Sequence, residues 1–446
     1  MRQQTNTVRA AFLATTTLFF AWGLITSMLD PLVAAVRGIF KLSNVEAQLS
    51  AFAFFIAYGL ISMPAATLVS RNGAVRAILL ALVTMVLACG VMLGAANVAS
   101  YAFVLVGLFL LASGITVLQV AANPLAAALG DPSRSHFRLT LSQTFNSFGT
   151  FIGPYLGAVL FLDGIEVTEG QAVTPAARDA ALAGIDRAYF WICGLLIILL
   201  AFFFLSRKVL TSAAPAKGGQ CMIALLKDAL SARWALIGSG ALFLYVGAEV
   251  AIGTQMALFL NSPDIWGQSD AAFAVPLLGH AMASDGVVGV SLQEAGKAVA
   301  FYWGGAMVGR AIGSFLLARF DAARLLGIVT VTAASMCAFI VLNGGVAAGF
   351  VALGIGLFNA VMFPLIFTLT LERSTANPEA TSGLLCTAIV GGAIVPLVTG
   401  KVADLSGFGQ AFVVPAACYL LLSGFAALTM RSRQGDAYRR GHAQPD

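Results

Sequence analysis

The sequence predicts an all-α membrane protein with twelve transmembrane helices arranged as two six-helix halves. Of its 446 residues, 59% are hydrophobic and only 10% are charged, and the mean hydropathy is +0.90. A soluble domain of this size would carry about a quarter charged residues, so most of this surface must face lipid. A helix satisfies its own backbone hydrogen bonds without water, and about 20 apolar residues are enough to cross a bilayer.

Long apolar segments recur along the whole chain, joined by short connections that leave no room for a soluble catalytic domain. The first segment is too long and uninterrupted for a cleaved signal peptide. The twelve segments lie near residues 10–36, 44–69, 76–97, 100–129, 139–162, 188–206, 234–260, 294–318, 323–342, 345–371, 382–400 and 408–430.

A polar, cation-containing stretch divides these segments into two sets of six. We expect an N-terminal six-helix half at 1–206, a cytoplasmic linker at 207–233, a C-terminal half at 234–430 and a cytoplasmic tail at 431–446. Two six-helix halves are typical of secondary transporters, which bind their substrate between the halves near the membrane midplane.

The positive charges predict the orientation. If the N-terminus is cytoplasmic, eighteen Lys and Arg residues lie in inner segments and six in outer ones. Cytoplasmic loops carry such an excess, so both termini are expected inside. This sorting also explains the net charge of +5 without a nucleic-acid partner.

Two carboxylates interrupt the apolar segments. Asp30 ends an uncharged stretch that begins at Ala10, and Glu249 ends one that begins at Ala235. A carboxylate inside a bilayer costs about 2.5–3.5 kcal/mol even on lenient insertion scales, and it usually faces a water-filled cavity. We expect both to handle a co-transported cation. The alternative is a structural carboxylate paired with a buried cation, for which Arg310 is available.

Amide side chains recur at helical spacing in the fourth and fifth segments. Gln119 and Asn123 are four residues apart, and Gln143 and Asn146 are three apart, so each pair shares one helix face. Pro124 removes a backbone donor next to the first pair. Amides donate and accept hydrogen bonds, as sugar hydroxyls require. The alternative is hydrogen bonding between helices.

Aromatic residues near these positions fit the same ligand class, because a pyranose ring has an apolar face that stacks on aromatic rings. Trp22 lies eight residues before Asp30, and Tyr245 lies four before Glu249. Asn359 repeats in the second half the position of the fourth-segment asparagine. These residues complete the predicted substrate site.

Arg310 is predicted in the inner half of the eighth helix, among glycines that allow close helix approach. It is a candidate gate or carboxylate partner. The alternative is that its side chain extends to the inner interface.

The sequence lacks the motifs of nucleotide hydrolysis, serine hydrolases and zinc enzymes. No P-loop, GxSxG or HExxH motif occurs, the six cysteines form no CxxC pair, and the three histidines do not cluster. We therefore expect no enzyme activity, metal or cofactor, and an ion gradient, of protons or sodium, as the source of energy.

Two stretches of the first half resemble the fucose:proton symporter family of the major facilitator superfamily. They are LQVAANP, ending at Pro124, and HFRLTLSQTFNSFG, beginning at His136. Segments YVGAE, VGRAIG and FPLIF, which begin at Tyr245, Val308 and Phe363, look like the matching second-half segments. The resemblance covers nearly the whole chain. It implies the twelve-helix alternating-access fold and cation-coupled monosaccharide uptake across a bacterial inner membrane.

The resemblance also assigns individual residues. Asp30 falls on the proton-binding aspartate of the first helix. Gln119 replaces a glutamate implicated in fucose binding, whereas Glu249 replaces a glutamine. This exchange resembles the glucose/galactose and N-acetylglucosamine branch, parts of which are sodium-linked. Arg71, in the loop after the second helix, and Arg138, in the fifth-helix motif, are candidate gating or ion-pair residues.

The expected function is therefore import of a glucose- or galactose-type hexose by cation symport, in a protein that functions as a monomer. N-acetylglucosamine and fucose are the alternative substrates. A drug exporter would favour an apolar cavity over paired amides, and a non-transporting sugar sensor would be expected to carry a signalling domain.

Overall fold

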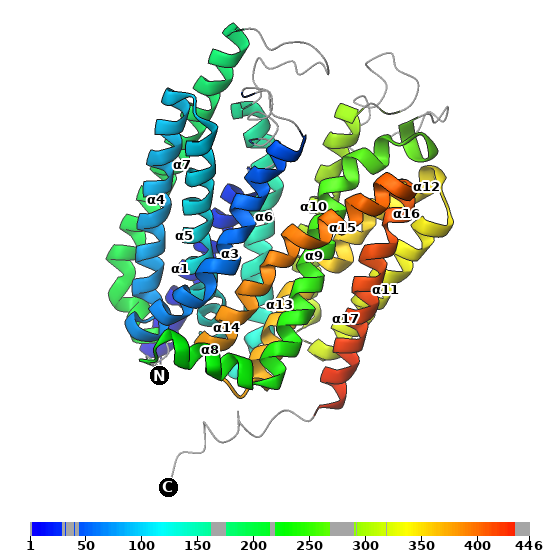
Figure 1. Cartoon of the computed structure of the whole chain (residues 1–446). Coiled ribbons are helices and arrows are strands. Elements are labelled where there is room, and N and C mark those ends of the chain that lie inside the picture. Colours follow the sequence, from blue (N-terminus) through cyan, green and yellow to red (C-terminus); the bar gives the residue numbers. More distant parts are fainter. Residues whose placement is uncertain are drawn as a thin grey trace. The chain divides into compact units, whose positions relative to one another are not determined.

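Helices make up the described chain almost completely (Figure 1). The computed structural model describes residues 2–28, 32, 40, 44–161, 175–214, 219–267, 290, 292–317 and 319–432, and it contains no strand within them. The longer helices are α1 (Arg2–Ser27), α3 (Asn44–Asn72), α4 (Ala74–Val98), α5 (Tyr101–Ala128), α6 (Ser135–Phe161), α7 (Pro175–Ala213), α8 (Met222–Ser231), α9 (Arg233–Asn261), α10 (Leu292–Leu316), α11 (Ala322–Leu342), α12 (Gly345–Asn359), α13 (Met362–Arg373), α14 (Pro378–Thr387), α15 (Gly391–Ser406) and α17 (Val413–Arg431). The all-α prediction is confirmed within this part.

Ten stretches of the described chain are long and apolar enough to cross a membrane. The remaining two predicted segments correspond to α6 and α10, which are not among the ten. Both helices carry polar side chains along their length, such as Gln143 and Arg310. The structure therefore describes a multi-pass helical protein.

Contacts divide the chain into two compact units. Unit 1 comprises Met1–Ser239 and Ser374–Ala388, and unit 2 comprises Gly240–Arg373 and Ile389–Asp446. The first boundary lies within α9, a few residues after the predicted linker. The segment at 374–388, which includes α14, packs within unit 1 although it follows most of unit 2 in the sequence.

In unit 1, α4 packs against α5 and α7, α1 against α6, and α3 against α5, while α14 contacts α3, α5 and α8. Small residues bring α1 and α6 together. A Cβ atom at Gly23 would overlap the carbonyl oxygen of Asn146, and one at Gly149 would overlap that of Phe20. These glycines hold the backbone of α6 directly against α1.

In unit 2, α10 packs against α12, and α11 packs against α12 and α17. Glycines also allow the backbones of α10 and α12 to pack closely. A Cβ atom at Gly356 would overlap the carbonyl oxygen of Tyr302, and one at Gly309 would overlap that of Leu357. The close approach fixes Tyr302 and Arg310 of α10 relative to the end of α12.

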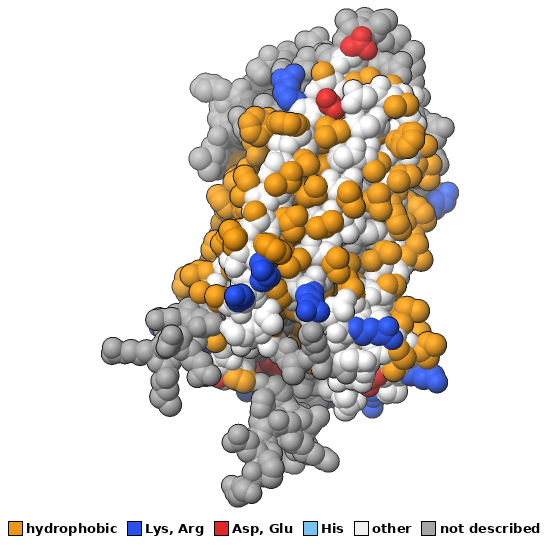
Figure 2. Space-filling model, turned by 90° about the vertical axis from the view of Figure 1, so that its left-hand side faces the viewer, with side chains coloured by type: hydrophobic (Ala, Val, Ile, Leu, Met, Phe, Trp, Pro, Cys, Tyr) orange, Lys and Arg blue, Asp and Glu red, His pale blue; other side chains and the backbone are white. Residues whose placement is uncertain are grey.

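The outer surface matches a lipid environment. On the face shown in Figure 2, hydrophobic side chains cover the middle, and most of the Lys and Arg side chains in view lie toward its lower end. Exposed apolar residues of α4 and α7, including Leu87, Phe190 and Leu205, contribute to the apolar surface of unit 1. In water, such a surface would be an aggregation site, whereas in a bilayer it is solvated.

Candidate functional site

The predicted amides of unit 1 lie on α5 and α6, and we call Gln119, Asn123, Gln143 and Asn146 the amide cluster. Nε2 of Gln143 donates to Oδ1 of Asn123 at 3.4 Å, so one residue from each pair meets across the two helices. Nε2 of Gln119 donates to the hydroxyl of Tyr58, on α3, at 2.9 Å. Tyr58 is almost fully buried, and the sequence carries no signal that pointed to it.

The fourth amide is held by the crossing of α1 and α6. Nδ2 of Asn146 donates to the carbonyl of Phe19 at 3.0 Å. Trp22 is buried and its ring packs on Phe19 with centroids 4.1 Å apart. Trp22 and Asn146 therefore both contact the Phe19 segment of α1.

The amide cluster is not satisfied by helix contacts alone. Nδ2 of Asn123 and the hydroxyl of Ser142 are buried and have no hydrogen-bond partner within the described part of the chain. An unpaired buried polar group costs about 1–3 kcal/mol, and such groups in native structures call for a specific explanation. Hydrogen bonding between helices thus accounts for contacts of Gln119, Gln143 and Asn146 and for Oδ1 of Asn123, but not for Nδ2 of Asn123.

In unit 2, Glu249 of α9 and Arg310 of α10 lie side by side. Nη2 of Arg310 is 3.6 Å from Oε1 of Glu249, and their side chains are 9% and 13% exposed. Nε of Arg310 donates to the carbonyl of Ala360 at 2.7 Å. Arg310 is therefore buried beside the carboxylate rather than extended toward an interface.

Proline explains why the Ala360 carbonyl is available. A proline has no N–H, so the carbonyl four residues before it lacks its helical donor. Pro364 occupies that position relative to Ala360, just after the break between α12 and α13. The guanidinium of Arg310 takes the place of the missing N–H.

The same arrangement occurs in unit 1 at the other Asn–Pro position. Pro124 lies within α5 and leaves the carbonyl of Val120 without a helical donor. The hydroxyl of Ser382, on α14, donates to this carbonyl at 3.1 Å. The sequence predicted the missing backbone donor but not the side chain that replaces it.

Two further tyrosines join the second site, and we call Tyr245, Glu249, Tyr302, Asn359 and Tyr419 the α9–α12 cluster. Nδ2 of Asn359 contacts the hydroxyls of Tyr302 at 2.6 Å and Tyr419 at 3.3 Å. The Tyr302 hydroxyl donates to the backbone carbonyl of Glu249 at 3.2 Å. The Tyr245 hydroxyl lies beside the Glu249 carboxylate and interacts with it.

The two remaining predicted arginines lie apart from these clusters. Arg138 is buried near the start of α6 and binds backbone carbonyls. Nε donates to Ala126 at 3.3 Å and Nη2 to Ala127, both at the end of α5, and Nη1 donates to Asp131, in the connection between α5 and α6, at 2.6 Å. These bonds satisfy orphan carbonyls of a helix C-terminus. Arg71 is exposed in the last turn of α3.

The pKa of Asp131, in the connection between α5 and α6, is lowered by its hydrogen bonds. Asp131 accepts hydrogen bonds from the backbone N–H of Ser133 at 2.9 Å and from its hydroxyl at 2.8 Å. These bonds favour the charged form, so the pKa of Asp131 lies below its ordinary value.

Asp30, the first predicted cation site, lies outside the described residues.

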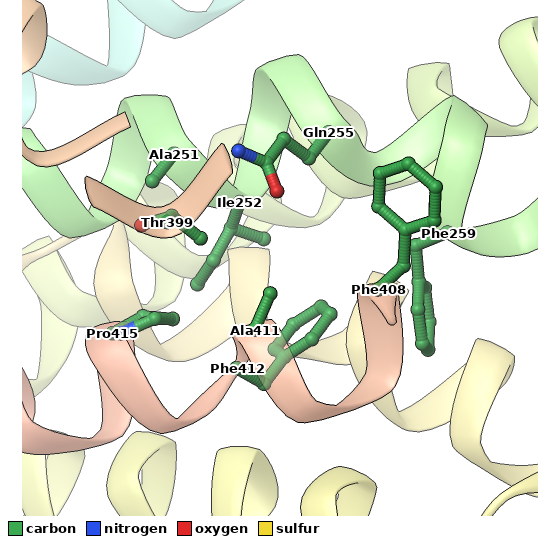
Figure 3. A pocket seen from close by; sticks show the side chains of 9 residues that line it. All are labelled: Ala251, Ile252, Gln255, Phe259, Thr399, Phe408, Ala411, Phe412 and Pro415. Atoms are coloured by element: carbon green, nitrogen blue, oxygen red, sulfur yellow. The ribbon is translucent and has the colours of Figure 1, made fainter. Parts of the chain in front are cut away.

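Unit 2 also has a small pocket, which the sequence did not predict. It is lined by α9, α15, α16 (Phe408–Ala411) and α17, and its residues are Ala251, Ile252, Gln255, Phe259, Thr399, Phe408, Ala411, Phe412 and Pro415 (Figure 3). The phenyl rings of Phe259 and Phe412 pack with centroids 4.7 Å apart, and Gln255 donates to the Pro396 carbonyl at 3.3 Å. The space holds about one water molecule, so it is too small for a monosaccharide.

Comparison with known proteins decides the family. The family model described as Major Facilitator Superfamily matches residues 11–284. This chain belongs to the Major Facilitator Superfamily. Membership confirms the prediction of a membrane transporter rather than an enzyme.

Relatives within the superfamily match almost the full length of this major facilitator. It is 36% identical to the glucose/galactose transporter of Brucella abortus, over 95% of this chain and 94% of that protein. It is 28% identical to the L-fucose-proton symporter of Escherichia coli, over 92% and 90% of the two chains. The predicted resemblance to the fucose:proton symporter family is confirmed.

A solved structure confirms the major facilitator fold. The crystal structure of a variant of the E. coli fucose:proton symporter, FucP, matches with a TM-score of 0.79 at 24% identity, covering 96% of this chain and 100% of that chain.

Proposed function

We propose that this major facilitator imports a glucose- or galactose-type hexose by cation symport through alternating access. The observation that carries the proposal is the 36% identity, along nearly the whole of both chains, with a protein named as a glucose/galactose transporter. N-acetylglucosamine and fucose are the alternative substrates, and the similarity to L-fucose-proton symporters keeps fucose in the test.

The polar clusters support a hydroxylated substrate. Among the described residues, Nδ2 of Asn123 in the amide cluster is a buried donor without a partner, and Oδ1 of Asn359 in the α9–α12 cluster is a buried acceptor without one. Sugar hydroxyls both donate and accept hydrogen bonds, so one ligand type can satisfy both groups. In this proposal Trp22 and Tyr245 supply aromatic surface beside the amides.

The coupling cation, a proton or sodium ion, binds at Asp30 and Glu249 in this proposal. Glu249 supports it because its carboxylate is nearly buried and lies between the Arg310 guanidinium, at 3.6 Å, and the Tyr245 hydroxyl. A carboxylate in this position can take up a proton or ligate a cation during the cycle. In this proposal Arg310 balances the charge of Glu249. Arg138 holds the inner end of α5 in place, and Arg71 contributes to gating at the exposed end of α3.

The proposed topology has twelve spans with both termini in the cytoplasm. It combines the ten apolar stretches with α6 and α10, and the distribution of Lys and Arg orients them. We also propose that the protein lies in a bacterial inner membrane and functions as a monomer. Its two six-helix halves are joined by the cytoplasmic linker at 207–233.

The test is uptake of labelled glucose, galactose, N-acetylglucosamine and fucose into proteoliposomes, with sodium and pH gradients imposed separately. We expect accumulation of glucose or galactose above the equilibrium level under one of the two gradients. Accumulation of none of the four sugars under either gradient would refute the proposal.

A further inference from the structure

Asn359 occupies an unusual position in the α9–α12 cluster. Its side chain is fully buried at the end of α12, and it contacts two tyrosine hydroxyls from different helices, Tyr302 of α10 and Tyr419 of α17. A tyrosine hydroxyl can donate or accept. The orientation of the amide therefore depends on where the hydroxyl protons go.

The carbonyl of Glu249 decides the orientation. Tyr302 has one hydroxyl proton, and its oxygen lies 3.2 Å from a backbone carbonyl that can only accept. The proton is used in that bond, so the Tyr302 hydroxyl must accept in its 2.6 Å contact with Asn359. The donor in that contact is Nδ2, because Oδ1 has no proton to give.

The two hydrogens of Nδ2 are then directed at Tyr302 and Tyr419, which leaves Oδ1 as an acceptor alone. This oxygen is buried and has no hydrogen-bond partner among the described residues. Rotating the amide would place Oδ1 against the lone pairs of Tyr302. The tyrosines thus hold the side chain in the orientation that presents a buried acceptor.

Two other buried polar groups of this cluster, the Tyr245 hydroxyl and the Glu249 carboxylate, interact with each other. Glu249 also interacts electrostatically with Tyr302, and Tyr245 with Tyr419. Among the described residues of this polar cluster, Oδ1 of Asn359 is thus a buried acceptor without a partner, which indicates a site for a polar ligand rather than a packing fault.

We infer that Oδ1 of Asn359 is an acceptor-only subsite for one donating hydroxyl of the substrate, and that Tyr302 and Tyr419 are the positioning residues that set this specificity. The inference rests on the proposed function and names one chemical requirement within it. At one ring position the sugar must carry a group that donates a proton. A cation ligated by the same oxygen is the competing occupant, and the adjacent guanidinium of Arg310 disfavours it.

Deoxy and fluorodeoxy analogues of the transported hexose test this requirement, because neither can donate a hydrogen bond at the changed position. Affinities are measured by isothermal titration calorimetry on the purified full-length protein. With the wild-type protein, both analogues at one position should bind roughly 5- to 150-fold more weakly than the parent sugar. In Asn359→Leu that difference should disappear.

The positioning role is tested by Tyr302→Phe and Tyr419→Phe. Each change frees the amide to turn, so the parent-to-analogue ratio at that position should fall toward one while the other positions keep their ratios. Tyr101→Phe is the matched control, because it removes a tyrosine hydroxyl bonded to Ser50 in unit 1 at 3.0 Å, and it should leave every ratio unchanged. If Asn359→Leu does not fold, the two tyrosine variants still decide the question.

The outcomes separate this inference from the proposed function. If no parent sugar binds, the proposed function fails and the inference fails with it. If a parent sugar binds but the ratio is the same in Tyr302→Phe and Tyr419→Phe as in the wild type, the inference alone is wrong. A change in sodium dependence with unchanged sugar ratios would assign Oδ1 to the cation instead.

Discussion

Arg310 makes a short hydrogen bond to a backbone carbonyl and a longer, ionic contact with Glu249. The 2.7 Å bond from Nε to the Ala360 carbonyl anchors the guanidinium, whereas Nη2 lies 3.6 Å from Oε1 of Glu249. The position of the cation is therefore set by the backbone at the end of α12 and not by the carboxylate.

The first prediction separates a structural pair from a functional one. Removing one partner of a buried ion pair leaves an uncompensated charge and costs about 3–5 kcal/mol. Glu249→Gln and Arg310→Gln should each lower the melting temperature of the purified protein and abolish gradient-driven uptake. The double variant should regain much of the stability without regaining uptake. If it regained both, Glu249 would serve only to hold α9 and α10 together.

The second prediction concerns Asp30. Asp30→Asn cannot exchange a proton or provide a charged cation ligand. It should lose gradient-driven accumulation in proteoliposomes while keeping counterflow exchange of the sugar between the two sides. Normal accumulation by this variant would remove Asp30 from the coupling mechanism.

The third prediction compares members of the amide cluster. Asn123→Ala and Gln143→Ala remove groups that meet across α5 and α6, and each should weaken sugar binding roughly 5- to 150-fold if a sugar hydroxyl is left unpaired. Thr84→Ala is a control, because that hydroxyl is bonded within α4 to Leu80. Affinities like the wild type in both amide variants would assign these residues to helix packing.

The sequence was sufficient for the all-helical membrane fold, and it named several residues that the structure places in the two polar clusters, whose roles remain predictions. Apolar segments predict spans because a bilayer demands them, and the amides of α5 and α6 stand at helical spacing. Three contacts were not predictable: Tyr58 with Gln119, Ser382 with Val120, and Tyr302 with Glu249. Each joins residues more than 50 positions apart, so it depends on packing that no local pattern encodes.

Arg138 shows the reverse situation, because the sequence identified the residue as a candidate gate or ion-pair partner but not the carbonyls that it binds. Its guanidinium donates to carbonyls of Ala126, Ala127 and Asp131 at once, a geometry that the single ammonium of lysine does not reproduce.

The fourth prediction follows from that geometry. Both Arg138→Ala and Arg138→Lys should lower thermal stability, by about 1.5–3 kcal/mol for each charge-assisted bond that is lost. Sugar affinity of the folded fraction should stay within about twofold of the wild type, because the contacts lie at a helix end. Full stability of the lysine variant would show that charge alone is needed. Melting curves and titration calorimetry measure the two quantities.

The fifth prediction tests the proline carbonyl of unit 1. Pro124→Ala supplies a backbone N–H for the Val120 carbonyl, which then depends less on the hydroxyl of Ser382. Ser382→Ala should therefore destabilise the wild type by about 1 kcal/mol and the Pro124→Ala background by less. Additive losses in the double-mutant cycle would show that the two residues are independent.

The assignment of α14 to unit 1 determines how this polypeptide can be divided. Neither unit is a continuous stretch of sequence, since residues 374–388 belong with a body that otherwise ends near 239. A gene cut in the linker would yield a second fragment that carries Ser382 and Asn377, although their partners Val120 and Asp228 lie in unit 1. If the cut falls before Asp228, the bond between Asp228 and Asn377 stays within the second fragment; if it falls after Asp228, the bond joins the two fragments. Reassembly would require the second fragment to place its α14 in unit 1, as in domain swapping.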